Sequence, residues 1–147
     1  MAKKSEHKIN CTDEMAKIAD IIISSIKIGD IITLRGNLGV GKTTLSKFII
    51  NSLTDKKKYI TSPTFNLVTI YDSGKCEIWH FDLYRLESPN DVFELGIEDA
   101  FERAISIIEW PEIIEDILPF EKIIDAKISY GETETERLIQ INDYRGN

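Results

Sequence analysis

The alternation of apolar and polar residues divides the chain into short buried strands and amphipathic helices. Residues 31–35 and 104–108 are apolar runs rich in β-branched residues, and each predicts a buried strand. A further apolar set recurs at helical spacing and consists of Met15, Ile18, Ala19, Ile22 and Ile26. That set predicts an amphipathic helix, and Thr12, followed by two acidic residues, is expected to be its N-cap.

The remaining patterns complete an α/β arrangement. In chain order they predict a strand at 7–11, a helix at 44–53, a brief strand at 59–60, strands at 66–71 and 76–81 joined by a hairpin turn at 72–75, helical turns at 89–96 and 97–103, a short helix at 111–117, and an antiparallel pair at 123–129 and 137–141. We therefore expect one domain over residues 1–147, with residues 1–6 as a disordered tail. Its mixed sheet should be parallel in the centre, antiparallel outside and flanked by helices.

Composition narrows the class of protein. The chain has 147 residues, which suits one domain, and no apolar run approaches the length of a membrane span. Cys11 and Cys76 have no partner at metal-ligand spacing, so we expect reduced thiols, and with no secretory signal a cytoplasmic protein. The net charge of -7 argues against autonomous nucleic-acid binding, because phosphates require a cationic surface. The protein could still act in an RNA pathway through another protein.

A complete phosphate-binding loop lies between the predicted strand at 31–35 and the helix that follows it. Its sequence is Gly36-Asn37-Leu38-Gly39-Val40-Gly41-Lys42-Thr43, which matches G-x-x-x-x-G-K-[ST], and Thr44 follows at the helix start. The glycines allow backbone N–H groups to surround anionic oxygens, and the helix adds its N-terminal dipole. Lys42 supplies a charge for the β- and γ-phosphates, and Thr43 a hydroxyl for Mg²⁺. The motif predicts a P-loop NTPase that binds a nucleoside triphosphate.

Two acids stand where such a loop requires a carboxylate for its metal. Glu109 follows the apolar run at 105–108 in the manner of a Walker B acid, and Asp82 follows the run at 78–81. Either acid alone has the alternative interpretation of a turn or N-cap residue. With the P-loop present, we expect at least one of them to bind Mg²⁺, directly or through water.

Other polar residues are weaker candidates. Thr64 and Ser62 lie in a segment that could sense the γ-phosphate, although a proline-containing turn explains them equally well. Arg85 and Arg35 could approach phosphate, and Arg85 could equally pair with a surface carboxylate. The guanine-reading N-K-x-D tetrapeptide is absent, which favours ATP over GTP.

Three further strings, taken with the P-loop, resemble the TsaE (YjeE) family of small bacterial ATPases. They are Ser62-Pro63-Thr64-Phe65-Asn66-Leu67-Val68, His80-Phe81-Asp82-Leu83-Tyr84-Arg85-Leu86 and Glu109-Trp110-Pro111-Glu112. The resemblance extends from about Thr12 to Arg137. It implies a P-loop domain that hydrolyses ATP with Mg²⁺ in making N6-threonylcarbamoyladenosine at tRNA position 37, by supporting turnover of a TsaB–TsaD complex.

The resemblance also implies roles for individual residues. Lys42 would hold the phosphates, Thr43 and Glu109 would ligate Mg²⁺, and Asp82 would orient water or act through the metal's second shell. Thr64 would belong to a switch-like loop, Trp110 would couple the nucleotide state to partner binding, and Thr12 or Asp13 would lie near the adenine. The acidic turn at 131–136 departs from the family pattern, so its contacts with nucleotide stay open.

Two functions of other classes also fit the loop. A stand-alone phosphotransferase would use the same cradle on a small metabolite. A non-catalytic nucleotide-sensing module would bind without hydrolysis and would tolerate the loss of Asp82 or Glu109.

Overall fold

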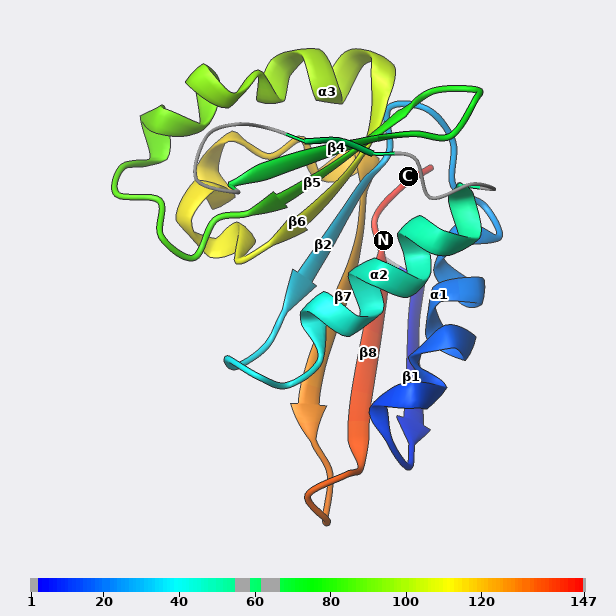
Figure 1. The fold of residues 1–147 in the computed structure, drawn as a ribbon. Helices are drawn as coiled ribbons and strands as arrows, with labels where there is room; N and C mark the ends of the chain where they lie inside the picture. Colours follow the sequence, from blue (N-terminus) through cyan, green and yellow to red (C-terminus); the bar gives the residue numbers. More distant parts are fainter. Residues whose placement is uncertain (1–2, 55–58, 62–66, 147) are drawn as a thin grey trace.

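The fold is built on one mixed sheet of eight strands, in the order β1-β8-β7-β2-β6-β5-β4-β3 (Figure 1). The computed structural model describes residues 3–54, 59–61 and 67–146. The strands are β1 Lys3–Ile9, β2 Ile31–Arg35, β3 Tyr59–Thr61, β4 Val68–Asp72, β5 Glu77–Asp82, β6 Ala104–Glu109, β7 Ile123–Tyr130 and β8 Arg137–Asp143.

The centre of the sheet is parallel and both sides are antiparallel, as predicted. β2 pairs in parallel with β6 and β7, and β6 pairs in parallel with β5. The hairpins β4–β5 and β7–β8 are antiparallel, and β3 and β1 add to them at the two edges. All six residues of β6 are buried, because helical segments cover both of its faces, and this explains its nearly uninterrupted apolar sequence.

Helical segments cover the two faces with separate cores. They are η1 Thr12–Glu14, α1 Met15–Ile23, α2 Lys42–Leu53, η2 Pro89–Leu95, α3 Ile97–Arg103, η3 Pro111–Ile117 and η4 Phe120–Lys122. Figure 1 shows α1 and α2 beside each other against β1, β8, β7 and β2. Their apolar residues form one core, whereas η2, α3 and η3 form the other core around Trp79 and Phe81.

The structure corrects three local expectations. β1 begins at Lys3, not at residue 7, because its backbone pairs with β8 from Lys3–Asp143 to Ile9–Arg137, so residues 3–6 are not a tail. Thr12 is the first residue of η1 and not an N-cap, since Cys11 precedes the turn and makes no side-chain cap. α2 begins at Lys42, two residues before the predicted start.

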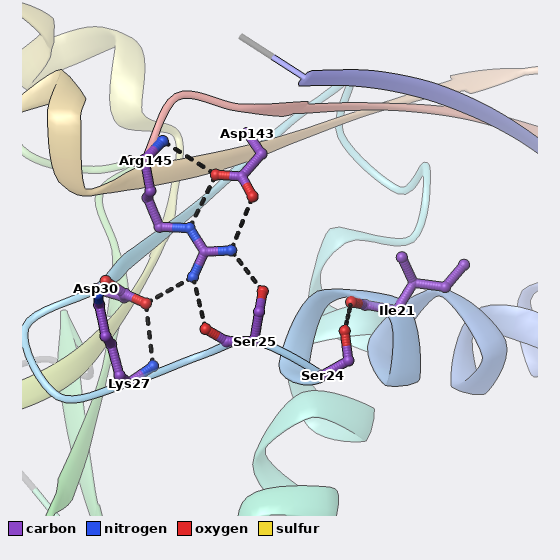
Figure 2. Close-up of polar contacts among 7 residues, drawn as sticks. All are labelled: Ile21, Ser24, Ser25, Lys27, Asp30, Asp143 and Arg145. Carbon is purple, nitrogen blue, oxygen red and sulfur yellow. Dashed lines mark hydrogen bonds and ion pairs between the residues drawn. The ribbon is translucent and has the colours of Figure 1, made fainter. Parts of the chain in front are cut away.

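Arg145 joins the chain end to the segment between α1 and β2 (Figure 2). Its guanidinium donates to both carboxylate oxygens of Asp143 at 2.9 Å, to Asp30 Oδ2 at 2.6 Å, and to the hydroxyl and carbonyl oxygens of Ser25. Asp30 is 3% exposed and also accepts the Lys27 N–H. The contacts fix the end of α1 relative to β8, since all donors of one planar group are used.

Within the part of the chain that the structure describes, no helix is long and apolar enough to cross a bilayer.

Candidate functional site: the phosphate-loop cavity

The P-loop and both predicted acids meet at the carboxyl ends of the central parallel strands. Leu34 on β2 pairs with Glu109 on β6, and Glu109 pairs with Asp82 on β5. This is the edge where parallel α/β sheets bind ligands. A cavity of about 510 Å³ opens there. It is lined by Leu38, Gly39, Gly41, Lys42, Thr43, Thr44, Leu67, Asp82, Tyr84, Arg85, Glu109 and Trp110.

Glu109 is the most tightly held of these groups. Its Oε1 accepts the Thr43 hydroxyl at 3.0 Å, and its Oε2 accepts the Ser46 hydroxyl at 3.2 Å. The His80 Nε2 lies 2.6 Å from the same Oε2 and acts as the donor when the carboxylate is ionised. Helix α2 and strand β5 therefore both position the acid that ends β6.

These partners keep Glu109 ionised despite its burial. Burial alone would raise the pKa, since Glu109 is only 2% exposed. The hydrogen bond and charge of His80, together with the Thr43 and Ser46 hydroxyls, outweigh burial and hold the pKa of Glu109 below its ordinary value. Mg²⁺ takes oxygen ligands and is usually bound by one or two carboxylates. The buried Glu109 carboxylate, with two hydroxyl groups beside it, could supply such oxygen ligands.

Lys42 reaches the cavity from the first position of α2. Its Nζ donates to the carbonyl oxygens of Gly36 and Asn37, the latter at 3.1 Å, and lies 3.7 Å from the centroid of the Trp110 ring. Burial lowers the pKa of Lys42, and the charges of Glu109, Glu112 and Asp82 only partly oppose this. The ammonium is held by the carbonyl oxygens of the loop beside the cavity, where an anionic ligand could serve as a further partner.

Trp110 occupies a backbone conformation that bulky residues rarely adopt. Its φ of 62° and ψ of 53° are left-handed, and it is the only non-glycine residue with positive φ among those described. The chain thereby turns from β6 into η3, and the indole packs against Tyr84 with ring centroids 4.8 Å apart. A strained aromatic residue over the phosphate-loop lysine indicates a functional constraint.

Comparisons with known proteins assign the chain to a family. The family model of "Threonylcarbamoyl adenosine biosynthesis protein TsaE" matches residues 9–139. This chain belongs to the TsaE family.

Individual TsaE proteins agree with this assignment. The chain is 42% identical over 112 residues to the TsaE of Rickettsia conorii, covering 76% of this chain and 64% of the relative. It is 33% identical over 125 residues to the TsaE of Bacillus subtilis, covering 84% and 77%. The crystal structure of Bacillus subtilis YdiB superposes with a TM-score of 0.77 at 29% identity, covering 98% of this chain and 88% of that one. The predicted P-loop NTPase fold and TsaE resemblance are confirmed; the chain spans under two thirds of the Rickettsia conorii relative's length.

Some predicted site residues of this TsaE-family chain do not line the cavity. Val40 is buried in the core beneath the loop, and Asn37 contributes its carbonyl oxygen to Lys42 and to the Val40 N–H. Thr12 borders Gly41, since a Cβ built on Gly41 would lie 3.5 Å from its methyl group. Thr64 lies outside the described residues.

Arg35 does not approach the cavity, contrary to the sequence expectation. Its Nε donates to Asp125 at 2.7 Å, and its Nη2 donates to both carboxylate oxygens of Glu115. The side chain lies on the opposite face of β2 from α2, because residues alternate faces along a strand. Arg85, by contrast, does line the cavity.

Sequence reasoning missed three contributors to the candidate site: His80, Ser46 and Tyr84. His80 lies two residues before Asp82, so period-two alternation places both on one sheet face. Ser46 follows Lys42 by one helical turn and so faces the same strand. Periodicity could have brought these two toward Glu109. Tyr84 follows the end of β5, where no periodicity applies.

Proposed function

We propose that this TsaE-family chain is a Mg²⁺-dependent ATPase whose hydrolysis of ATP supports turnover of a TsaB–TsaD complex during tRNA N6-threonylcarbamoyladenosine modification. The observation that carries the proposal is the convergence of Lys42, Thr43 and Glu109 on one cavity behind a complete P-loop. A protein that only capped a helix with glycines would need neither the buried acid nor its hydroxyl partners.

The loop residues would bind the triphosphate. The N–H groups of residues 39–44 and the Lys42 ammonium offer donors to phosphate oxygens. The Thr43 hydroxyl and the Glu109 carboxylate, 3.0 Å apart, would hold Mg²⁺. When bound, that ion would neutralise charge developing on the phosphate oxygens during transfer.

Asp82 would act on the water nucleophile. Its carboxylate faces the cavity from the strand beside Glu109, and the Tyr84 N–H donates to its Oδ1 at 3.3 Å. Because Oδ2 makes no hydrogen bond with the described residues, it remains available to accept a proton from water. A positioned carboxylate of this type contributes about 10²–10⁴-fold to a rate.

The partner is proposed from the family and from charge. With a net charge of -7 the chain is a poor ligand for RNA, so the contact with tRNA would belong to the TsaB–TsaD complex. Trp110 and Tyr84 line the cavity, and Tyr84 is 54% exposed. These aromatic side chains would contact both the nucleotide and a protein bound over the cavity, so the nucleotide state could affect binding of that protein.

Reconstitution tests the proposal. We expect slow release of phosphate from ATP by the chain alone, faster release with TsaB and TsaD, and loss of both in Asp82→Asn. Absence of a complex, or a complex that leaves the rate unchanged, would contradict the partner assignment. A phosphorylated metabolite formed from labelled ATP would instead identify a phosphotransferase, and nucleotide binding without turnover in every mixture would identify a sensing module.

A further inference from the structure

Arg137, at the first residue of β8, is buried and contacts the P-loop across 97 residues of sequence. It is 8% exposed, and its Nε donates to the carbonyl oxygen of Val40 at 2.8 Å. Its Nη1 donates to the carbonyl oxygens of Glu134 at 2.6 Å and Glu136 at 2.9 Å. One guanidinium thus joins the turn between β7 and β8 to the middle of the phosphate-binding loop.

The Arg137 guanidinium donates hydrogen bonds to backbone carbonyl oxygens and does not pair with an acid. Within residues 3–54 and 67–146, no carboxylate lies within ion-pair distance of it, and the Tyr130 ring covers it at 4.4 Å. A buried charge is costly unless its donors are used. Three carbonyl oxygens, each an acceptor in a turn or loop, compensate Arg137, so their positions are coupled to one another.

Peptide geometry relates this contact to the cavity. The Val40–Gly41 peptide is trans, so its C=O and N–H point in opposite directions. By holding the Val40 oxygen, Arg137 directs the Gly41 N–H away from itself, and Gly41 lines the cavity. We propose that Arg137 is a positioning residue that orients the Gly41 N–H toward bound phosphate, an inference that rests on the proposed nucleotide site.

The start of the loop is fixed by the same hairpin. A Cβ at Gly36 would lie 2.5 Å from the Ile128 carbonyl oxygen and 2.7 Å from the Val40 side chain, so only glycine fits there. β7 therefore supports Gly36 while β8 holds Val40. The β7–β8 hairpin continues past the end of β2 in Figure 1 and contacts the loop at Gly36 and at Val40. Phosphate binding should consequently order the turn at 131–136, and disorder of that turn should weaken phosphate binding.

Two matched lysine variants test the proposal. Arg137→Lys and Arg145→Lys each keep the charge and lose the planar set of guanidinium donors. Arg145 donates to Asp143, Asp30 and Ser25 in Figure 2 and makes none of the contacts at the P-loop. We would measure the Kd for ADP with Mg²⁺ by calorimetry and the urea midpoint of each protein. We expect Arg137→Lys to raise the Kd about tenfold, the effect of one such hydrogen bond. Arg145→Lys should lower the urea midpoint and leave the Kd at the wild-type value.

Equal Kd values for Arg137→Lys and wild type would overturn the inference. So would an equal rise of the Kd in Arg137→Lys and Arg145→Lys, because it would mean that any destabilised variant binds ADP poorly. Failure of wild type to bind ADP would overturn the proposed function as well. Hydrogen exchange of backbone amides can be measured on the wild-type protein, so this second test does not depend on whether a variant folds. ADP with Mg²⁺ should slow exchange at Gly131, whose N–H donates to Glu136, and unchanged exchange there would refute the coupling.

Discussion

Replacing Glu109 by Gln separates the acid's structural contacts from its binding of metal. In the wild type the carboxylate accepts three side-chain hydrogen bonds, from Thr43 at 3.0 Å, Ser46 at 3.2 Å and His80 at 2.6 Å. The amide has one oxygen, which can keep one side of this arrangement. Its NH₂ group would face groups that donate to the carboxylate in the wild type. Because the NH₂ group is itself a donor, those groups would have to become acceptors.

The magnitude follows from those bonds. A hydrogen bond to a charged group contributes about 1.5–3 kcal/mol and a neutral one about 0.5–1.5 kcal/mol, so three weakened bonds would cost about 3 kcal/mol. Relief of the buried charge offsets part of this. The lowered pKa of Glu109 shows that, after the opposing effect of burial, its partners still favour the ionised form. We therefore expect Glu109→Gln to lose about 1–2 kcal/mol of unfolding free energy without ligand.

Urea unfolding at neutral pH, in three conditions, measures both effects. ADP at a hundred times its Kd should add about 2.7 kcal/mol to the wild type. If Glu109 ligates Mg²⁺, the difference between ADP with Mg²⁺ and ADP with chelator should vanish in Glu109→Gln. The matched control is Glu98→Gln, which removes an exposed carboxylate on α3.

Two results would refute this reasoning. A ligand-free Glu109→Gln as stable as wild type would mean that the three hydrogen bonds do not contribute as argued. A variant that keeps the Mg²⁺-dependent increase would mean that the metal is held without this carboxylate.

Three further outcomes are expected. Asp82→Asn should reduce single-turnover phosphate release about 100-fold or more and leave the Kd for ADP unchanged, and an equal loss of binding would contradict a role in hydrolysis. Trp110→Gly should be about 1 kcal/mol more stable in urea than Trp110→Ala, because only glycine adopts the φ of 62° without strain. Asp143 has a lowered pKa, chiefly through the Arg145 hydrogen bond, so its contribution is present above the ordinary value of 3.8 and is lost as pH falls through the lower folded value. Asp143→Asn should therefore flatten the fall in urea midpoint between about pH 5 and pH 2, and an unchanged profile would exclude this pair as its cause.

The local elements and the position of the P-loop could be predicted from the sequence because their causes are local. The β-branched runs at 31–35 and 104–108 form the buried strands β2 and β6, and the helical stripe that begins at Met15 faces the core. Within the loop of residues 36–43, Gly36, Gly39 and Gly41 adopt positive φ values, which glycine takes without strain. The parallel pairing of β5 with β6 places Asp82 beside Glu109, because both acids lie at the carboxyl ends of neighbouring strands.

The contacts that depend on distant partners were decided by the tertiary structure alone. No local pattern shows that Lys3 pairs with Asp143, or that Arg35 donates to Asp125 and so does not line the cavity. The acceptors of Arg35, Arg137 and Arg145 include residues about 90 or more positions away in the sequence, so only packing determines which acceptor each guanidinium reaches. The sequence by itself determined that a complete P-loop motif joins β2 to α2. Tertiary structure decided which residues contact that loop from outside it, because Arg137 reaches Val40 only after β8 has joined the sheet through β7.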